Sequence, residues 1–335
     1  MQHHISSLIA AGALMLATAT CACQTARKEK NSVSDASAAA VPAVKFNADS
    51  AYSYIKAQVD LGTRVPGSPG HAKCVEYITS ELGRHGVDTV TIQKGTVTAF
   101  TGETLPITNI MGSINPDATK RVLIAAHYDT RPWADNETDE VRRATPILGA
   151  NDGASGVGVI LELARVLSAN RPEIGVDFLL VDAEDYGDNE GFGNKEDTWC
   201  LGTQYWGANQ PYTAANRPAY GIVLDMVGGR NARFHREYYS NKAARPVVDK
   251  VWGTAARIGY SRFFPGEIGG SLIDDHLYIN RAGIPCIDIV ECNNSQTHSF
   301  PPTWHTLADN MSAIDTAPLK AVGQTVLTVL LEERP

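Results

Sequence analysis

Four apolar runs, each about as long as one strand, are the feature that most constrains the fold of this chain. Residues 122–126 read Val-Leu-Ile-Ala-Ala, and an uninterrupted apolar run of this length is typical of a strand buried on both faces of a sheet. Comparable runs occupy residues 176–181, 221–224 and 284–290. Segments with helical patterns separate them. This alternation predicts a single α/β domain of three layers, in which a central, mostly parallel, twisted sheet is covered by helices on both faces.

Periodicity and capping signals predict the remaining elements. Val and Ile alternate with polar residues over 87–100, which predicts an antiparallel strand or hairpin, and a further strand is expected at 107–113. Asp49 or Ser50 is expected to cap the first helix. Helices are expected at about 50–61, 69–85, after Asp152, and at 246–258, 274–281 and 317–331.

The first 44 residues have the pattern of an export signal followed by a linker. Residues 5–19 are all apolar or small, a run long enough for the core of a signal peptide and too short to span a bilayer. We therefore expect a signal peptide at 1–23, a flexible linker at 24–44, a catalytic domain at 45–335, and export from a bacterial cytoplasm. Because Cys21 and Cys23 follow the apolar run, a soluble periplasmic protein and a membrane-anchored lipoprotein both stay open.

Charge and cysteine content exclude some classes of protein. The net charge is −8, and the domain has no run rich in Lys or Arg, which argues against a nucleic-acid partner. Its four cysteines form no C-x-x-C pair, so a thiolate zinc site is not expected. Export would permit disulfides, but neither their pairing nor the oligomeric state follows from the sequence. These cysteines are Cys74, Cys200, Cys286 and Cys292.

Polar residues follow three of the predicted buried strands directly. His127 and Asp129 end the first strand, Glu184 and Asp185 follow the second, and Asp225 follows the third. In open sheets of this kind, ligands bind outside the carboxyl ends of the strands. Carboxylates buried there without a cation would be costly. The five side chains therefore predict a site at one edge of the sheet.

Asp152 and His305 can complete this cluster. Asp152 stands in a loop of small residues, at or just before a predicted helix, where an acid could equally cap the helix with nothing bound. With the other acids in reach, Asp152, Asp185 and His305 suit the three ligands of a catalytic zinc. Glu184, beside the metal and not on it, is placed for a general base. His127 could be a ligand of a second zinc ion, with Asp152 bridging the two metals. Alternatively, it could hydrogen-bond to the ligands of a single zinc ion.

The sequence resembles a known family, the zinc aminopeptidase superfamily, and within it the animal-like, type II glutaminyl cyclases of bacteria. The resemblance runs from about Arg64 to Asn310. It includes Ser68 in a Gly-Ser-Pro-Gly loop, Asp274 in an Asp-Asp-His run, and Trp304 before the late histidine. The motifs are Arg64-x-Pro66-Gly67-Ser68-Pro69-Gly70, His127-Tyr128-Asp129, Asn151-Asp152, Glu184-Asp185, Leu224-Asp225, Ile273-Asp274-Asp275-His276, Trp304-His305 and Asp309-Asn310.

The resemblance implies a zinc-aminopeptidase-like fold and a role for each matching residue. Zinc, one ion expected, would bind the three ligands named above, and the catalytic residues would be Glu184 as proton shuttle with Asp225 and Asp274 as hydrogen-bonding acids. Phe300, Trp304 and Asp275 would bind the substrate. The chain departs from the family pattern at several positions; Ala126 and Ser155, for example, leave no disulfide of the animal kind near the site. Asp185 replaces a longer glutamate, Ile273 replaces a glutamine of the animal enzymes, and Trp199 is only a candidate for their tryptophan after the acidic pair.

The implied activity is conversion of the N-terminal glutamine of peptides and proteins to pyroglutamate with release of ammonia. An exported aminopeptidase with two zinc ions is the alternative, because every ligand for a second metal is present, His127 and Asp225 included. Residues around Asp274 and Trp304 favour the cyclase. A third reading, a lipoprotein that binds peptides without catalysis, predicts a lost base, whereas Glu184 is intact.

Overall fold

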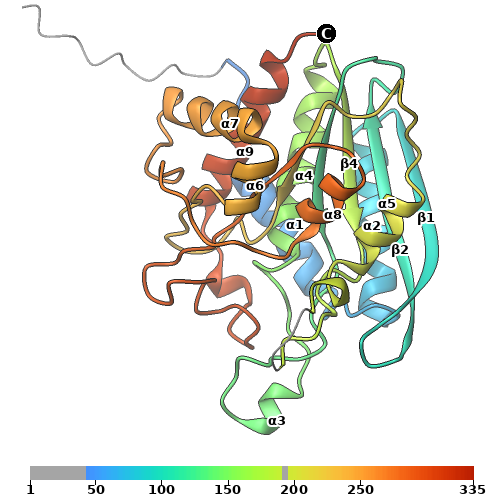
Figure 1. The fold of residues 1–335 in the computed structure, drawn as a ribbon, viewed down its shortest axis with the longest axis vertical. Coiled ribbons are helices and arrows are strands. Elements are labelled where there is room, and N and C mark those ends of the chain that lie inside the picture. Colours follow the sequence, from blue (N-terminus) through green and yellow to red (C-terminus); the bar gives the residue numbers. More distant parts are fainter. Residues whose placement is uncertain (1–42, 191–194) are drawn as a thin grey trace, which may run out of the picture. The chain divides into compact units, whose positions relative to one another are not determined.

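The fold is a mixed six-stranded sheet flanked by helices (Figure 1). The computed structural model describes residues 43–190 and 195–335. The strands are β1 (Thr89–Thr98), β2 (Thr104–Ile114), β3 (Arg121–His127), β4 (Gly175–Val181), β5 (Tyr220–Leu224) and β6 (Cys286–Ile289). The α-helices are α1 (Ala48–Asp60), α2 (Pro69–Arg84), α3 (Glu140–Arg143), α4 (Ala154–Ala169), α5 (Leu201–Ala208), α6 (Tyr238–Ala243), α7 (Arg245–Arg257), α8 (Asp275–Arg281) and α9 (Thr316–Glu332).

The sheet has the strand order β1-β2-β4-β3-β5-β6. Strands β4, β3, β5 and β6 are mutually parallel, whereas β1 pairs with β2 and β2 with β4 in the antiparallel sense. Every residue of β3, β4, β5 and β6 is buried, but β1 alternates between exposed and half-buried positions. The predicted parallel centre and the antiparallel strands before it are both confirmed.

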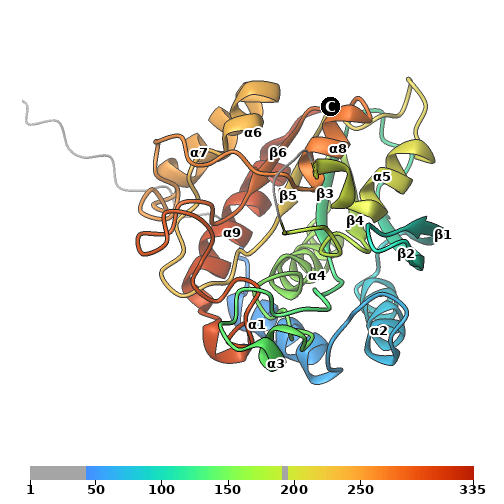
Figure 2. The ribbon, with the colours of Figure 1, turned by 60° about the horizontal axis from the view of Figure 1, so that its bottom comes forward.

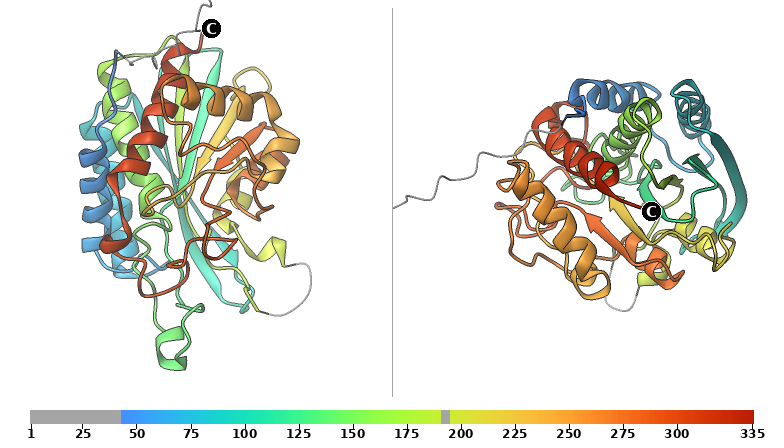
Figure 3. Two further views of the ribbon diagram at one scale, coloured as in Figure 1. Left: turned by 90° about the vertical axis from the view of Figure 1, so that its left-hand side faces the viewer. Right: turned by 90° about the horizontal axis from the view of Figure 1, so that it is seen from above.

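Helices cover both faces of the sheet, as predicted. Figure 2 shows α1, α4 and α9 on one side and α5 and α8 on the other, and Figure 3 gives two further views of this arrangement. The larger core lies under α1, α4, α7 and α9. The smaller core lies between the sheet and helices α5 and α8, where Trp206 and Ile279 pack on Leu123, Leu179 and Val223.

Several boundaries differ from the sequence prediction. Asn47, and not Asp49 or Ser50, caps α1 by accepting hydrogen bonds from the N–H groups of both. Ser68 caps α2 by accepting a hydrogen bond from the N–H group of His71.

Helices α3, α5 and α6, of four, eight and six residues, were not predicted, because so few residues show little of a 3.6-residue period. The seven-residue α8 is the short helix that was predicted. Acidic side chains cap two of the three unpredicted helices, Asp139 at α3 and Glu237 at α6.

The structure bears on the state of the domain cysteines and on membrane-spanning helices, but not on the predicted signal peptide. The four domain cysteines are buried and unpaired. Within 43–190 and 195–335, no helix has both the length and the apolar character needed to cross a bilayer. The predicted signal peptide at 1–23, and all of the predicted linker except residues 43–44, lie outside the described residues. The predicted division into signal, linker and catalytic domain therefore stays a prediction.

Candidate active site

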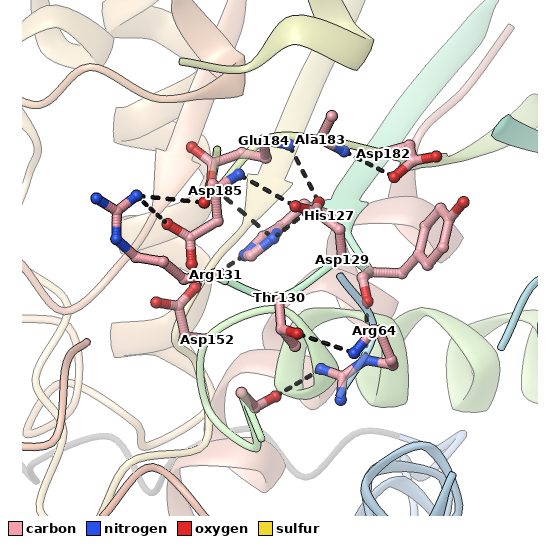
Figure 4. Close-up of polar contacts among 12 residues, drawn as sticks. Arg64, His127, Asp129, Thr130, Arg131, Asp152, Asp182, Ala183, Glu184 and Asp185 are labelled. Atoms are coloured by element: carbon pink, nitrogen blue, oxygen red, sulfur yellow. Dashed lines mark hydrogen bonds and ion pairs between the residues drawn. The ribbon is translucent and has the colours of Figure 1, made fainter. Parts of the chain in front are cut away.

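Three parallel strands deliver the predicted polar residues to one edge of the sheet. His127 is the last residue of β3 and pairs in register with Val181, the last residue of β4. Glu184 and Asp185 follow β4 after a short turn, and Asp225 follows β5 directly. Figure 4 shows the His127, Glu184 and Asp185 side chains near one another above these strand ends. The register of the sheet thus produces the cluster that the sequence predicts.

The loop before α4 brings Asp152 to the same edge. Gly149 and Gly153 have positive φ angles of 55° and 95°, which glycine adopts with little strain. Asp309 accepts hydrogen bonds from the N–H groups of Asn151 at 2.8 Å and Asp152 at 3.1 Å. Gly153 is the N-cap residue of α4, and no side chain caps this helix. The capping alternative for Asp152 is therefore wrong.

Arg64, the first residue of the sequence motif, fixes this loop from below. Its guanidinium is fully buried and donates to the carbonyl oxygens of Tyr128 at 2.8 Å, Leu148 at 2.7 Å and Gly149 at 2.7 Å. The backbone N–H of Arg64 donates to the hydroxyl of Thr130 (Figure 4). One buried side chain therefore joins the end of β3 to the loop that carries Asp152.

Two groups of possible metal ligands meet at Asp152. Asp152, Asp185 and His305 form one group, and His127, Asp152 and Asp225 form the other; all five residues are buried. In the first group, His305 Nε2 lies 3.1 Å from Asp185 Oδ1 and 3.8 Å from Asp152 Oδ2. In the second, His127 Nε2 lies 3.1 Å from Asp152 Oδ1 and 3.2 Å from Asp225 Oδ1.

The first group fits a zinc ion. Oδ2 of Asp152 and Oδ2 of Asp185 are buried and have no hydrogen-bond partner, an arrangement that is costly unless a cation accepts their lone pairs. His305 Nδ1 lies 3.0 Å from Asp135 Oδ1. A proton donated there leaves the lone pair of Nε2 free for a metal, the usual arrangement of a zinc-bound histidine. Two carboxylates and one imidazole leave a fourth position for substrate.

Asp129 aligns the two acidic residues that follow β4. Its Oδ1 accepts a hydrogen bond from Glu184 N at 3.1 Å, and its Oδ2 accepts one from Asp185 N at 3.2 Å (Figure 4). Ala183, directly before them, has a positive φ of 50°. A non-glycine residue held in this region costs on the order of 1–3 kcal/mol, and such strain gathers at functional sites. Met226 and His305 share this conformation beside the same cluster.

Burial controls the protonation of the acids in the cluster. Burial raises the pKa of Glu184 well above its usual range; the charge of His127 opposes this rise, and the charges of Asp274 and Asp185 reinforce it. Burial also raises the pKa of Asp225 to about 8. A bound cation would lower both pKa values, because it favours the ionised carboxylates. Glu184 therefore has the raised pKa, caused by burial, that is typical of a carboxyl that exchanges protons in a reaction.

A pocket of about 250 Å³ opens above these residues. The ring of His305 stacks on that of Trp304, with centroids 3.7 Å apart, and lies nearly parallel to that of Trp199, with centroids 6.1 Å apart. Phe300 packs against Trp304 at 4.4 Å. The lining contains Asp152, Glu184, Asp185, Asn189, Trp199, Asp225, Met226, Ser271, Leu272, Ile273, Asp274, Phe300, Trp304 and His305. The pocket is thus aromatic on the His305 side and acidic at its base.

The two neighbouring acids of the Asp-Asp-His run separate in the structure. Asp274 lines the pocket and caps α8. Asp275 is fully buried outside the lining, and burial raises the pKa of its carboxyl to about 7. The structure therefore brings nine of the ten predicted site residues together, His127 through its contacts with Asp152 and Asp225, and leaves Asp275 behind the pocket wall.

A second buried acid supports that wall. Oε1 of Glu237 accepts hydrogen bonds from Leu272 N at 3.1 Å and Tyr239 N at 2.9 Å, and Oε2 accepts one from Ser240 N at 2.5 Å. His276 Nε2 lies 3.1 Å from the same Oε2. Glu237 is fully buried. One carboxylate therefore joins the first turn of α6, the pocket residue Leu272 and helix α8.

Sequence reasoning missed several residues around the site. Arg131 lies 3.4 Å from Asp185 Oδ1, holds Asp135 and stacks over Trp199 at 4.9 Å. An Arg and an Asp four positions apart, directly after His127-x-Asp129, were the available signal for this pair. Locally Glu237 is only a helix cap, and its role at the pocket gave no signal because its partners there come from positions 272 and 276.

Comparison with known proteins agrees with this geometry. The structure of Bacteroides thetaiotaomicron glutaminyl cyclase bound to N-acetylhistamine superposes with a TM-score of 0.83 at 49% identity, over 88% of this chain and 100% of that one. A structure described as a leucine aminopeptidase precursor from the same species gives 0.82 at 48% identity, over 89% and 100%. Bos taurus glutaminyl-peptide cyclotransferase is 23% identical over 306 residues, 80% of this chain and 78% of the relative.

These comparisons confirm the resemblance to glutaminyl cyclases with a zinc-aminopeptidase-like fold. The sequence also matches the model of peptidase family M28 over residues 109–330, which span every strand from the end of β2 to β6 and all the predicted site residues. The chain belongs to peptidase family M28.

Proposed function

We propose that this chain is a zinc-dependent glutaminyl-peptide cyclotransferase, which converts the N-terminal glutamine of peptides and proteins to pyroglutamate and releases ammonia. The observation that carries the proposal is that Asp274, Phe300 and Trp304 line the same pocket as Asp152, Asp185 and His305. Asp274 and Trp304 belong to the motifs that favour a cyclase over an aminopeptidase, and Phe300 packs against Trp304. The likeness to the glutaminyl cyclase at 49% identity supports the same conclusion.

The pocket suits one glutamine side chain. Trp304 and Phe300 offer apolar surface to its methylene groups, and Asp274 and Asp225 offer acceptors to its amide N–H groups at the acidic base. When bound to Asp152, Asp185 and His305, zinc supplies Lewis-acid polarisation of the side-chain carbonyl. Since the attacking amine and this carbonyl belong to the same residue, holding them in a reactive conformation accounts for much of the rate enhancement.

Glu184 carries the proton in the reaction. As a carboxylate it removes a proton from the α-amine, whose nitrogen attacks the side-chain carbonyl carbon and forms the ring C–N bond. The bond from that carbon to the amide nitrogen then breaks. Glu184 returns the proton to the leaving nitrogen, which departs as ammonia, and the carboxylate is restored. The pKa of Glu184, raised by burial, suits both directions of this transfer.

We propose that one zinc ion is sufficient. His127 Nε2 lies close to both Asp152 Oδ1 and Asp225 Oδ1, at 3.1 Å and 3.2 Å. A protonated His127 therefore supplies, between these carboxylates, the positive charge that a second metal would supply. Burial acts to lower the pKa of His127, but the nearby carboxylates of Asp129, Asp152 and Asp225 outweigh it and raise the pKa well above its usual value. The imidazolium form is favoured.

The alternative remains an aminopeptidase with a second zinc on His127, Asp152 and Asp225. Its support is the structure described as a leucine aminopeptidase precursor at 48% identity. In that reaction, Glu184 would deprotonate a water molecule that attacks the first peptide bond. The two reactions differ in their products, in the substrates they accept, and in the number of metal ions.

Mass spectrometry of the products separates the two functions. The purified protein is incubated with one peptide that begins with glutamine and a matched peptide that begins with leucine, and zinc per chain is counted on the same sample. The cyclase converts only the glutamine peptide, which loses ammonia while every peptide bond stays intact, with about one zinc bound. Release of free leucine or glutamine, with about two zinc ions, establishes the aminopeptidase and overturns the proposal.

We also propose that the protein is exported. The support is the apolar run at residues 5–19, followed by Cys21 and Cys23. Cell fractionation tests this proposal, since an exported protein leaves the cytoplasmic fraction and loses residues at its N-terminus. Incorporation of labelled fatty acid, and its loss when both cysteines are replaced by serine, would identify a lipoprotein. Retention of the intact chain in the cytoplasm would overturn the proposal.

A further inference from the structure

Cys200 is a buried thiol in direct contact with Glu184. Its Sγ lies 3.3 Å from Glu184 Oε1, and its backbone N–H donates to the carbonyl oxygen of Glu184 at 2.9 Å. Cys200 is fully buried and directly precedes helix α5. It has a positive φ of 54°, an uncommon conformation for a non-glycine residue. The backbone is therefore held in an unfavourable conformation at the residue whose side chain reaches Glu184.

The Glu184 carboxylate has few other partners. Among residues 43–190 and 195–335, the thiol of Cys200 makes the one hydrogen bond found to this carboxylate. The nearest cationic group, His127 Nδ1, lies 3.9 Å from Oε2. Burial raises the pKa of Cys200 well above its usual range, so the sulfur keeps its proton and can donate it. The S–H group thus contacts one carboxylate oxygen and leaves the other without a hydrogen bond.

We infer that Cys200 is a positioning residue for the reaction: its S–H group holds one oxygen of Glu184 and thereby fixes the rotamer in which the other oxygen exchanges protons with the substrate. The inference rests on the proposed role of Glu184. It follows from the 3.3 Å contact, from complete burial, and from the backbone hydrogen bonds that fix Cys200 against the Ala183–Glu184 segment. Because Cys200 does not line the pocket, its effect passes through Glu184.

The expected effect is on turnover and not on binding. In Cys200→Ala the carboxylate of Glu184 loses its donor, and kcat should fall roughly twofold to twelvefold, the range expected for one hydrogen bond. KM and zinc per chain should stay within about twofold, since no substrate contact or ligand changes. In Cys200→Ser a hydroxyl replaces the thiol as donor, so most of the lost kcat should return.

Cys74→Ala is the matched control. Cys74 is also fully buried and unpaired, but it lies in α2 and does not line the pocket. Its loss should lower the melting temperature about as much as the loss of Cys200 and leave kcat unchanged. Equal kcat in Cys200→Ala and the wild type would overturn the inference. So would a loss in Cys200→Ala that Cys200→Ser does not restore.

A spectroscopic measurement tests the contact without any activity. The infrared S–H band that disappears in Cys200→Ala should lie at lower frequency than the band that disappears in Cys74→Ala, because its proton is hydrogen-bonded. It should move to higher frequency in Glu184→Ala. No shift in Glu184→Ala would overturn the contact itself. Absence of cyclisation by the wild-type protein would instead overturn the proposed function, whatever the S–H bands show, so the two failures are distinguishable.

Discussion

Asp135 Oδ1 lies 3.0 Å from Nδ1 of His305, and the guanidinium of Arg131 donates hydrogen bonds to both oxygens of the same carboxylate. Burial acts to raise the pKa of Asp135, but these contacts with His305 and Arg131 outweigh it and hold the pKa below its usual range. The ionised carboxylate keeps the proton of His305 on Nδ1. Nε2 therefore presents its lone pair to the metal position defined by Asp152 and Asp185.

Replacement of Asp135 by alanine should weaken zinc binding. Without Asp135, the His305 ring loses the partner that fixes its orientation and its protonated nitrogen, and such partners are typically worth 10- to 100-fold in metal affinity. Competition with a chromogenic chelator measures the dissociation constant. Asp139→Ala, which removes an exposed carboxylate from the same segment, is the control and should bind zinc like the wild type. Unchanged affinity in Asp135→Ala would show that His305 does not depend on this contact.

Glu184→Gln should separate catalysis from metal binding. The amide keeps the shape of the side chain but cannot accept a proton, so kcat should fall by roughly 10²- to 10⁴-fold, the usual contribution of a general base. Zinc per chain and the melting temperature should change little, because Glu184 is not among the proposed ligands. Steady-state kinetics and metal analysis on one preparation test both statements. Turnover at the wild-type rate would remove Glu184 from the mechanism.

The sequence predicted the sheet edge because that edge depends on local patterns. The apolar runs of β3, β4 and β5 identify buried strands, and the residue after each buried strand must lie at a carboxyl end. His127 and Asp225 could therefore be assigned to one edge without any knowledge of the register. The loop of Asp152 was predicted as well, although its capping alternative was wrong.

The supporting residues could not be predicted, because their partners are distant in the sequence. Asp135 contacts His305 across 170 positions, and Glu237 contacts Leu272 across 35. Asp275 shows that the sequence also cannot tell when two adjacent residues lie in different places. It is adjacent to Asp274, but the start of α8 turns the two side chains into different environments, and only Asp274 lines the pocket.

Glu237→Gln should alter the pocket wall. Both oxygens of Glu237 accept backbone N–H groups, so an amide nitrogen in either position faces a donor, and the free energy of unfolding should fall by ~1–3 kcal/mol. The wall at Leu272 should then be less well fixed, raising KM for the peptide more than it lowers kcat. Chemical denaturation and steady-state kinetics measure the two effects. Glu267→Gln, which changes an exposed carboxylate nearby, is the control and should alter neither the stability nor KM. If Glu237→Gln had the KM of the wild type, the role of Glu237 in the pocket would be contradicted.

Stability at acidic pH should depend on Glu333. Burial alone would raise its pKa, but hydrogen bonds from Lys120, Lys250 and Tyr220 outweigh burial and lower the pKa to about 2. A carboxyl with a pKa of about 4.3 in the unfolded chain therefore contributes stability above that pH, and the contribution is lost as the pH falls toward 2. Glu333→Gln should be less stable by on the order of 1 kcal/mol at pH 7. The difference from the wild type should shrink at pH 3, as measured by urea unfolding; a difference that stays constant with pH would exclude this carboxylate as its source.

Removal of the metal should destabilise the folded chain. Without a cation, the buried oxygens of Asp152 and Asp185 would have no partner. Bound zinc stabilises the folded chain by about 4 kcal/mol when the free zinc concentration is 1,000-fold above its dissociation constant, and this stabilisation would be lost. For a domain of this size the melting temperature should fall by roughly 5–10 °C. Scanning calorimetry with and without a chelator measures the change, which added zinc should reverse and magnesium should not.

His305→Ala should abolish the response to the chelator, because the variant lacks one of the three ligands. A chelated protein that contains no zinc and melts at the original temperature would show that these carboxylates do not hold a metal in the folded state.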